Sequence, residues 1–196
     1  DIVVRVSPRI SEIDAAAWDA CASPDAATRN PFVTHAFLKA LEDAGTVTAQ
    51  TGWLPHHLSL EIDDEIAACA PAYLKSHSQG EYIFDYGWAD AYERAGGDYY
   101  PKLQIAVPFT PVPGPRLLTR PGPDADRNRD YLAAGAVELA RKQGLSSVHM
   151  TFVTKPTWDA LGDIGFLQRT DQQFHWQNDG YDSFDSFLQA LASRKR

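Results

Sequence analysis

Apolar residues recur at helical spacing in several parts of the chain. The clearest case is residues 127–143, where a regular apolar stripe is followed by Gly144, a residue type that commonly ends helices. Asn30 and Pro31 signal another helix start, since asparagine caps helices and proline fits the first helical position. Ser11 is the predicted cap of the first helix. The same spacing predicts helices over 11–22, 31–44, 90–95, 127–143, 154–161 and 184–191.

Short apolar runs bounded by turn residues predict strands between these helices. The runs 57–62 and 66–74 flank Asp63, Asp64 and Glu65, which is typical of a β-hairpin. Four prolines make 109–116 an edge strand or a loop, because proline cannot donate to a central ladder. The order of elements indicates a mixed α/β fold with helices on both faces of a mixed sheet. The predicted strands are 2–6, 57–62, 66–74, 81–85, 103–107, 147–153 and 165–176.

Composition is that of a soluble globular domain. The chain has 196 residues, of which 44% are hydrophobic and 22% are charged. The net charge of −8 argues against a surface that coats nucleic acid, although it leaves room for a local basic patch. No apolar run reaches the roughly 18 residues of a membrane span, and no export signal opens the chain. We therefore expect a cytoplasmic protein, with Cys21 and Cys69 reduced and buried, while a disulfide between them stays open.

The stretch from residue 75 to residue 118 mixes aromatic, glycine, proline and hydrogen-bonding residues more densely than the rest of the chain. Such a mixture is typical of a wall that holds a large polar ligand. Cationic side chains there can hold a phosphate or carboxylate, and aromatic rings can stack on a sugar or line a peptide groove. A second polar and aromatic run, 169–181, can border the same cleft. An ordinary core of aromatic residues with surface lysines fits the pattern about equally well. The predicted substrate-binding residues are Lys75, Gln79, Tyr86, Trp88, Tyr100, Lys102, Arg116 and Gln172.

Several familiar chemistries are disfavoured by the absence of their motifs. No Gly-x-Ser-x-Gly elbow surrounds Ser76 or Ser78, so a serine hydrolase is not indicated. No paired Cys-x-x-Cys or His-Glu-x-x-His occurs, so no metal site is predicted. The glycine loops that bind nucleotides or the pyrophosphate of coenzyme A are also missing, so no cofactor is bound by a recognisable motif. His35 and His149 fall in helix and strand patterns and are interpreted as structural.

Two long segments carry a family resemblance. They are SHSQGEYIFDYGWADAYERAGGDYYPKLQIAVPFTPVPGPRLL at 76–118 and FLQRTDQQFHWQNDGYDSFDSFLQALASRKR at 166–196. Both resemble the FemAB-like proteins of peptidoglycan biosynthesis and recognition, which belong to the GNAT-type acyl-CoA N-acyltransferase superfamily. The resemblance implies a GNAT-like fold with a central mixed, mostly antiparallel sheet. It also implies a GNAT-like domain over 1–180, with 181–196 beginning a helix that leads to a second such domain outside this chain; the run 194–196 is then a cut rather than a natural end.

The resemblance further implies transfer of an acyl or aminoacyl group to an amine. The donor would be acyl-CoA or aminoacyl-tRNA, the latter bound only through the missing half, and the acceptor a peptidoglycan-precursor peptide. Direct attack by an amine needs a proton acceptor and oriented dipoles rather than a protein nucleophile. By chemistry, the candidate proton acceptors are Asp85 and His77, with Lys75 and Lys102 as anion anchors. The alternative is a non-catalytic module that recognises peptidoglycan or a peptide.

Overall fold

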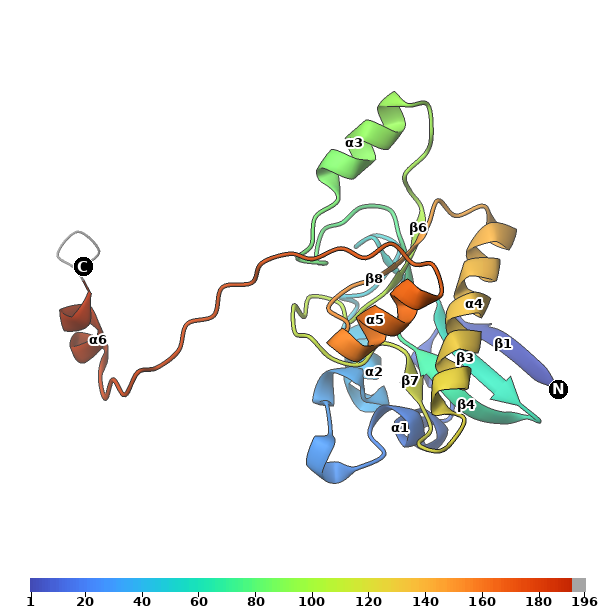
Figure 1. Ribbon diagram of the computed structural model, residues 1–196, viewed down its shortest axis with the longest axis horizontal. Coiled ribbons are helices and arrows are strands. Elements are labelled where there is room, and N and C mark those ends of the chain that lie inside the picture. The colour runs from blue at the N-terminus through green and yellow to red at the C-terminus, as the bar shows by residue number, and fades with distance from the viewer. Residues whose placement is uncertain (192–196) are drawn as a thin grey trace.

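The computed structural model describes residues 1–191 and shows a mixed α/β fold (Figure 1). The strands are β1 (Ile2–Ser7), β2 (Trp53–Pro55), β3 (His57–Ile62), β4 (Glu65–Ala70), β5 (Ala72–Lys75), β6 (Lys102–Ile105), β7 (Leu118–Thr119) and β8 (Val148–Met150). The helices are α1 (Ala15–Ala22), α2 (His35–Asp43), α3 (Tyr86–Arg94), α4 (Ala125–Gln143), α5 (Lys155–Asp163) and α6 (Phe184–Ala190). Short 3-10 turns occupy Ile10–Glu12, Ala26–Thr28 and Pro31–Val33.

The strands form two four-stranded sheets. The first sheet has the order β1-β3-β4-β7, and the second sheet has the order β2-β5-β6-β8. Every neighbouring pair is antiparallel except β6 and β8, which run parallel. The predicted run 66–74 is therefore two strands, because Pro71 separates β4 in the first sheet from β5 in the second. The mixed, mostly antiparallel arrangement with helices on both faces is otherwise as expected from the sequence.

The main apolar core lies between α4 and one face of both sheets. Leu58 and Leu60 of β3 alternate toward this core, as do Leu103 and Ile105 of β6, and all four are fully buried. Alternation has this result because successive side chains of a strand point to opposite faces. Figure 1 shows α4 lying across the strands of the first sheet.

A second core covers the other face of the first sheet. Trp18 of α1 and Leu38 of α2 are fully buried there, and the indole Nε1 of Trp18 donates to the carbonyl of Val33 at 2.9 Å. Cys21 and Cys69 belong to the same core and are both buried free thiols, as the sequence predicts. The first sheet thus meets an apolar core on each face, but its outer face also carries Ser59 and the Arg5–Glu61 ion pair. The buried lysines lie in the second sheet.

The predicted hairpin is confirmed, and its turn has an identifiable geometry. Asp63 and Asp64 have φ values of 50° and 67°, so both central residues of the turn lie in the left-handed region. This is the conformation of a two-residue type I′ turn, which matches the twist of the strands on either side. Aspartate tolerates it better than most residues because its side chain can hydrogen-bond locally.

Two helix starts differ from the sequence prediction. The first helix begins at Ala15, because Asp14, rather than Ser11, accepts a hydrogen bond from the Ala17 amide. Asn30 caps a 3-10 turn, and α2 begins after Thr34, whose hydroxyl accepts from the Phe37 amide. In both places several capping residue types lie close together, and packing of Trp18 and Leu38 selects among them.

Two predicted strands are wrong. Residues 81–85 form a loop in which Tyr82 has a φ of 59°, a value that a strand residue does not adopt. This loop leads into α3, which begins at Tyr86 and not at Asp90 as predicted. Residues 164–180 contain no strand and run outward from the body, with Leu167 95% exposed and Phe174 86% exposed. Their apolar and polar alternation resembles a strand, but no neighbouring strand in the described chain pairs with it.

We call residues 167–191 the C-terminal arm, and Figure 1 shows it ending in α6 at a distance from the body. The helix coincides with the one predicted over 184–191, and Ser183 and Ser186 form a reciprocal capping box at its start. The predicted continuation to a second domain stays a prediction, and residues 192–196 lie outside the described part of the chain. Within residues 1–191, no helix combines the length and apolar character that crossing a bilayer requires.

The contact of α4 with β1 can be tested at Gly135. A Cβ built there would lie 2.5 Å from Cγ2 of Val4, whose branched side chain has little freedom to turn away. Helix propensity alone favours alanine over glycine by about 1 kcal/mol. We expect Gly135→Ala to stabilise the Val4→Ala variant by roughly this amount, and to be clearly less favourable, or destabilising, in the natural sequence. Urea unfolding of the four proteins measures the difference; an equal effect in both backgrounds would contradict the close packing.

Candidate active site

One face of the second sheet is polar although it is buried. Lys75 of β5 lies directly opposite Lys102 of β6, and the next row holds Tyr73, Gln104 and His149 of β8. The first four of these residues are fully buried. The opposite face of the same strands carries the leucine and isoleucine side chains of the main core. A strand that alternates in this way therefore places a polar layer inside the molecule, where its hydrogen bonds must be satisfied.

Lys102 is the centre of this layer. Its ammonium donates to Oε2 of Glu81 at 2.8 Å and also to Oδ2 of Asp85, and the three side chains are almost completely buried. Both acids come from the loop that was predicted to be a strand. The loop folds back over the sheet because a buried ammonium without carboxylate partners would be very costly. The amide of Asp85 donates to the hydroxyl of Ser78 at 3.3 Å and fixes the end of the loop.

Asp85 joins the polar layer to the surface. Its Oδ1 lies 3.3 Å from Nη1 of Arg169, and its Oδ2 lies 3.6 Å from Nδ1 of His149. Burial alone would raise the pKa of the Asp85 carboxyl, but the hydrogen bond and charge of Lys102 outweigh it and hold the pKa below its ordinary value. The carboxylate is therefore ionised at neutral pH. A fixed negative charge beside an imidazole is the arrangement that orients a histidine base.

His149 is the most exposed of the strand residues in this polar layer, with 22% of its side chain accessible. Burial and the positive charge of Lys102 lower its pKa to about 4, although Asp85 acts in the opposite direction. The imidazole is thus neutral at neutral pH and keeps a lone pair. The ring of Tyr99 packs edge-on against it, with 6.0 Å between ring centroids. Because Nδ1 faces Asp85, Nε2 is the nitrogen available to a substrate.

Lys75 occupies a different environment from Lys102. Its Nζ donates to the Gln79 carbonyl at 3.1 Å and lies 3.6 Å from the ring centroid of Trp53. Burial lowers its pKa to about 7, and the nearby charge of Glu81 only partly opposes this. Lys75 has no carboxylate within hydrogen-bond distance in the described chain.

Aromatic side chains form the outer rim of the site. The rings of Phe84 and Tyr86 stack with 5.4 Å between centroids, and the guanidinium of Arg169 lies 5.3 Å from the ring of Trp88. Phe84, Tyr86 and Trp88 are 52–59% exposed, so they are not core residues. The ring of Tyr100 lies deeper, with its centroid 5.9 Å from Nζ of Lys102. Figure 1 shows α3, which carries Tyr86 and Trp88, standing out from the body.

The remaining predicted site residues lie around this centre in different ways. The His77 ring lies over Gly52, where an added Cβ would come within 2.2 Å of the ring, and its Nδ1 accepts from the Gln79 amide. His77 has no contact with Asp85 among the described interactions. Gln172 is exposed on the C-terminal arm, and Gln79 contributes its backbone carbonyl rather than its side chain to Lys75. Their predicted binding roles stay predictions.

Arg116 is buried away from the charged group. Its three guanidinium nitrogens donate to the carbonyls of Thr151, Pro115 and Val112 at 3.1, 3.1 and 2.7 Å. Burial lowers its pKa to about 10. These hydrogen bonds hold the proline-rich loop against the end of β8. They also occupy the guanidinium nitrogens with which Arg116 would bind an anionic ligand. The predicted role in substrate binding finds no support in this geometry.

Three polar atoms of the buried layer have no hydrogen-bond partner within residues 1–191. They are the hydroxyl of Tyr73, Oε1 of Glu81 and Oε1 of Gln104, whose amide nitrogen donates to the Thr151 hydroxyl at 3.1 Å. Unpaired buried polar atoms are uncommon, and each costs about 1–3 kcal/mol. Three further unpaired atoms lie elsewhere, in Ser23, Arg120 and Asn128, so the unpaired oxygens support a functional role for this layer only together with its buried charges.

Sequence reasoning interpreted His149 as structural and gave Glu81 and Arg169 no individual site role, although both lie in the two polar and aromatic stretches. A usable signal exists in β6, where lysine and glutamine alternate with leucine and isoleucine in a strand with apolar neighbours. His149 occupies a comparable position in β8. By contrast, nothing local to Arg169 indicates that it reaches Asp85, which is 84 residues away in the chain.

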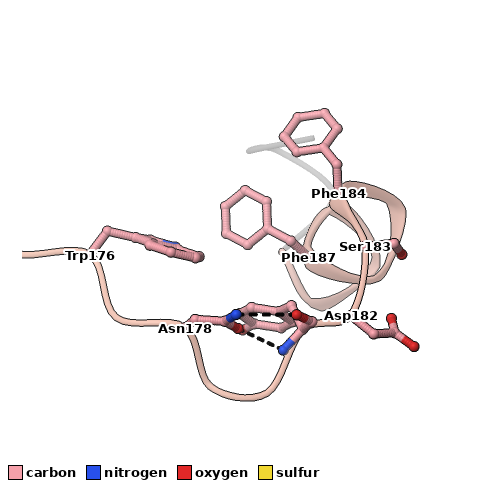
Figure 2. Close-up of a pocket in the computed structure, with 7 residues that line it drawn as sticks. Trp176, Asn178, Asp182, Ser183, Phe184 and Phe187 are labelled. Carbon is pink, nitrogen blue, oxygen red and sulfur yellow. Dashed lines mark hydrogen bonds between the residues drawn. The ribbon is translucent and has the colours of Figure 1, made fainter.

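Metal-ligating side chains and the surface of the C-terminal arm are the two other features that bear on ligand binding. Within residues 1–191, no group of three or more histidine, cysteine, aspartate or glutamate side chains is arranged to hold a metal ion. A hollow of about 510 Å³ lies on the C-terminal arm and is lined by Trp176, Tyr181, Phe184 and Phe187. Figure 2 shows the rings of Trp176, Phe184 and Phe187 around it. Asp182 is at its rim, but its carboxylate points away from the rings. The hollow is apolar and separate from the charged residues around Asp85.

A family model matches residues 9–196, almost the whole chain. The matched family is FemAB-like, described as peptidoglycan biosynthesis/recognition. The chain belongs to the FemAB-like family. This confirms the resemblance seen in the two long segments of the sequence. A comparison with curated protein sequences finds no match.

Solved structures with a similar fold include acetyltransferases. A GCN5-related N-acetyltransferase from Ralstonia eutropha has a TM-score of 0.52 at 11% identity, over 90% of this chain and 99% of its own. An acetyltransferase from Trypanosoma brucei and an aminoglycoside N-acetyltransferase in complex with CoA both score 0.49, at 13% and 11% identity. Each covers 91% of this chain, and the matches span 100% and 95% of the two structures. The first match shows that this FemAB-like chain has the GNAT fold.

The uncharged state of His149 predicts a measurable pH dependence of stability. Its pKa is about 4 in the folded protein and about 6.5 in the unfolded chain, so the unfolded chain binds more protons between these values. The free energy of unfolding should therefore fall as the pH is lowered from about 6.5 to about 4. His149→Gln should lose less stability over this window, by up to about 3 kcal/mol. Urea unfolding at several pH values measures this, and parallel curves for the two proteins would contradict it.

Proposed function

We propose that this FemAB-like chain transfers an acyl or aminoacyl group to an amine of a peptidoglycan-related compound. In this proposal His149 accepts the proton and Asp85 orients it. The family description supports the link to peptidoglycan, and the GNAT fold supports acyl transfer. The observation that carries the proposal is the buried, ionised Asp85 lying 3.6 Å from Nδ1 of a neutral and partly exposed His149.

The chemistry requires no covalent intermediate on the protein. The amine nitrogen attacks the acyl carbon of the donor, a C–N bond forms, and the nitrogen becomes positively charged and acidic. Nε2 of His149 takes a proton from this nitrogen, and Asp85 stabilises the resulting imidazolium. The bond from the acyl carbon to the leaving oxygen or sulfur then breaks, and the leaving group keeps the electron pair. Because the pKa of His149 is low, the proton moves late, after the nitrogen has gained its charge.

The surroundings of His149 suit a substrate that approaches from the rim. Arg169 supports Asp85 from the side opposite to Lys102, and its guanidinium also lies over Trp88. In this proposal Tyr86, Trp88 and Tyr100 line the approach, which is the binding role that the sequence suggested for them. Acyl-CoA and aminoacyl-tRNA both remain proposed donors, and a cytoplasmic location stays a prediction.

A second candidate function is recognition of a peptidoglycan-related ligand without catalysis. It is favoured by the exposed aromatic rim, since rings such as Phe84 and Tyr86 provide contact area for sugars and peptides without any catalytic group. The two proposals differ in the part given to His149. Catalysis requires its free nitrogen, whereas recognition by the rim does not.

The decisive experiment compares His149→Gln with the natural protein in an acyl-transfer assay. The assay supplies acetyl-CoA or an aminoacyl-tRNA as donor and a muropeptide amine as acceptor. We expect His149→Gln to lower kcat by roughly 100- to 1,000-fold, the usual contribution of a general base, with little change in KM. Asp85→Asn should lower kcat less and should also move the acid limb of the pH profile.

His56→Gln is the matched control, because the half-buried His56 side chain hydrogen-bonds to Gln143 at 3.1 Å and none of its described hydrogen bonds or ion pairs reaches Asp85, Lys102 or His149. It should keep full activity. Muropeptide binding without measurable transfer in the natural protein, unaffected by His149→Gln, would replace catalysis by recognition. Loss of activity in His77→Gln but not in His149→Gln would instead favour the proton acceptor predicted from the sequence.

A further inference from the structure

Two lysines face each other across β5 and β6 in the buried layer. Lys75 and Lys102 are Cα partners in the antiparallel register, and both are fully buried. Like charges directly opposite each other destabilise a sheet even at the surface, and burial makes the repulsion stronger. The charge of Lys102 contributes to the lowered pKa of Lys75. A fold has no structural need for this pair, because two apolar residues would be more stable there.

Glu81 is the counter-ion between the two lysines, but it hydrogen-bonds to only one of them. Its Oε2 accepts from Lys102 at 2.8 Å, while its Oε1 is buried without a partner. Lys75 feels the charge of Glu81 but donates its hydrogen bond to the Gln79 carbonyl instead. Oε1 of Glu81 therefore accepts no hydrogen bond in the described chain, and Lys75 makes no hydrogen bond to Glu81. An anion with more oxygens would satisfy both lysines better than this single side chain does.

The segment that carries Glu81 is weakly attached to the body. It leads directly into α3, which has no buried residue. Gly80 and Gly96, on either side of the segment that contains Glu81 and α3, have φ values of 78° and 86°. The Trp53 indole donates to the Gln79 carbonyl and the Phe109 amide donates to the Gly80 carbonyl, both at 3.1 Å, and the two lysines add polar contacts. Few buried apolar contacts mean a low free energy of local opening.

We propose that Lys75 and Lys102 form a binding site for an anionic group, and that Glu81 occupies this site when no ligand is bound. A phosphate or carboxylate of the ligand takes the place of the Glu81 carboxylate between the two ammonium groups, and the loop of residues 76–84 moves outward with Glu81. Lys102 keeps its second partner, Asp85, so the pairing of Asp85 with His149 is retained. The site is adjacent to the proposed proton acceptor.

The biological meaning of this site rests on the proposed function. Under that function the anionic group can be of two kinds. A pyrophosphate would belong to an acyl donor or to a nucleotide-linked acceptor, and a carboxylate would belong to the stem peptide of the acceptor. The chain lacks a glycine-rich phosphate loop, so side-chain cations must perform this task if a phosphate is bound. The binding measurement itself does not depend on catalysis.

The test measures binding of inorganic pyrophosphate and of N-acetyl-D-alanine to the natural protein by calorimetry. Glu81→Gln removes the internal competitor and should tighten binding of the true ligand class by about tenfold or more. Lys75→Met should weaken binding by a similar factor, and Lys39→Met on the exposed face of α2 should change nothing. If pyrophosphate alone responds, the site holds a phosphate; if N-acetyl-D-alanine alone responds, it holds a carboxylate.

Amide hydrogen exchange provides a second readout that surface binding would not alter. Exchange in residues 76–84 should speed up when the ligand displaces Glu81, and it should already be fast in Glu81→Gln. Unchanged affinity in Glu81→Gln, or equal losses in Lys75→Met and Lys39→Met, would overturn the proposal. If the protein binds the anion but transfers no acyl group, the proposed enzyme activity is rejected and the anion site stands. If it transfers an acyl group but Glu81→Gln does not change anion affinity, the anion site is rejected and the enzyme activity stands.

Discussion

The ammonium of Lys102 is the constraint on which the rest of the site depends. It is fully buried, and it is stable there because Glu81 and Asp85 both accept from it. Breaking such a group by removing one partner typically costs about 3–5 kcal/mol, because a buried charge is left uncompensated. The loop of residues 76–85 must therefore fold over the second sheet. Asp85 is brought beside His149 and Arg169 as a consequence of neutralising a lysine.

The same constraint divides the molecule into two kinds of interior. The first sheet meets an apolar core on each face, and burial of apolar surface is the main stabilising contribution to a fold. The second sheet shares the main core on one face and holds the charged layer on the other. The buried charges and the unpaired oxygens of Glu81 and Gln104 thus lie in a region whose other face is firmly packed. The polar layer can therefore lower the free energy of unfolding without unfolding the chain, because the rest of the fold is well packed.

The charged layer also connects the two proposals made for this FemAB-like chain. Lys102 contacts Asp85, which orients the proposed base, and Glu81, which covers the proposed anion site. An anion that replaced Glu81 would leave Asp85 as the one acid of this loop still bound to Lys102. Binding of the anionic group and the state of the base are therefore linked through one ammonium. Such a link suits a transferase, in which the acceptor amine should react only when the substrate is in place.

The sequence by itself determined the fold class, the helices α4, α5 and α6, the β3–β4 hairpin and the family. These depend on periodicity, on turn residues and on long motifs, all of which are local in the chain. It also placed Asp85, Lys75 and Lys102 among the candidate residues, because an unusual mixture of residue types marks their segment. Only the tertiary structure decided that Lys102 pairs with Glu81, that His149 and Arg169 meet Asp85, and that Arg116 is bound to carbonyls. The contacts of Lys102 and Asp85 join residues that are 17 to 84 positions apart, and the free energy that selects them is the neutralisation of buried charge, which no local pattern contains.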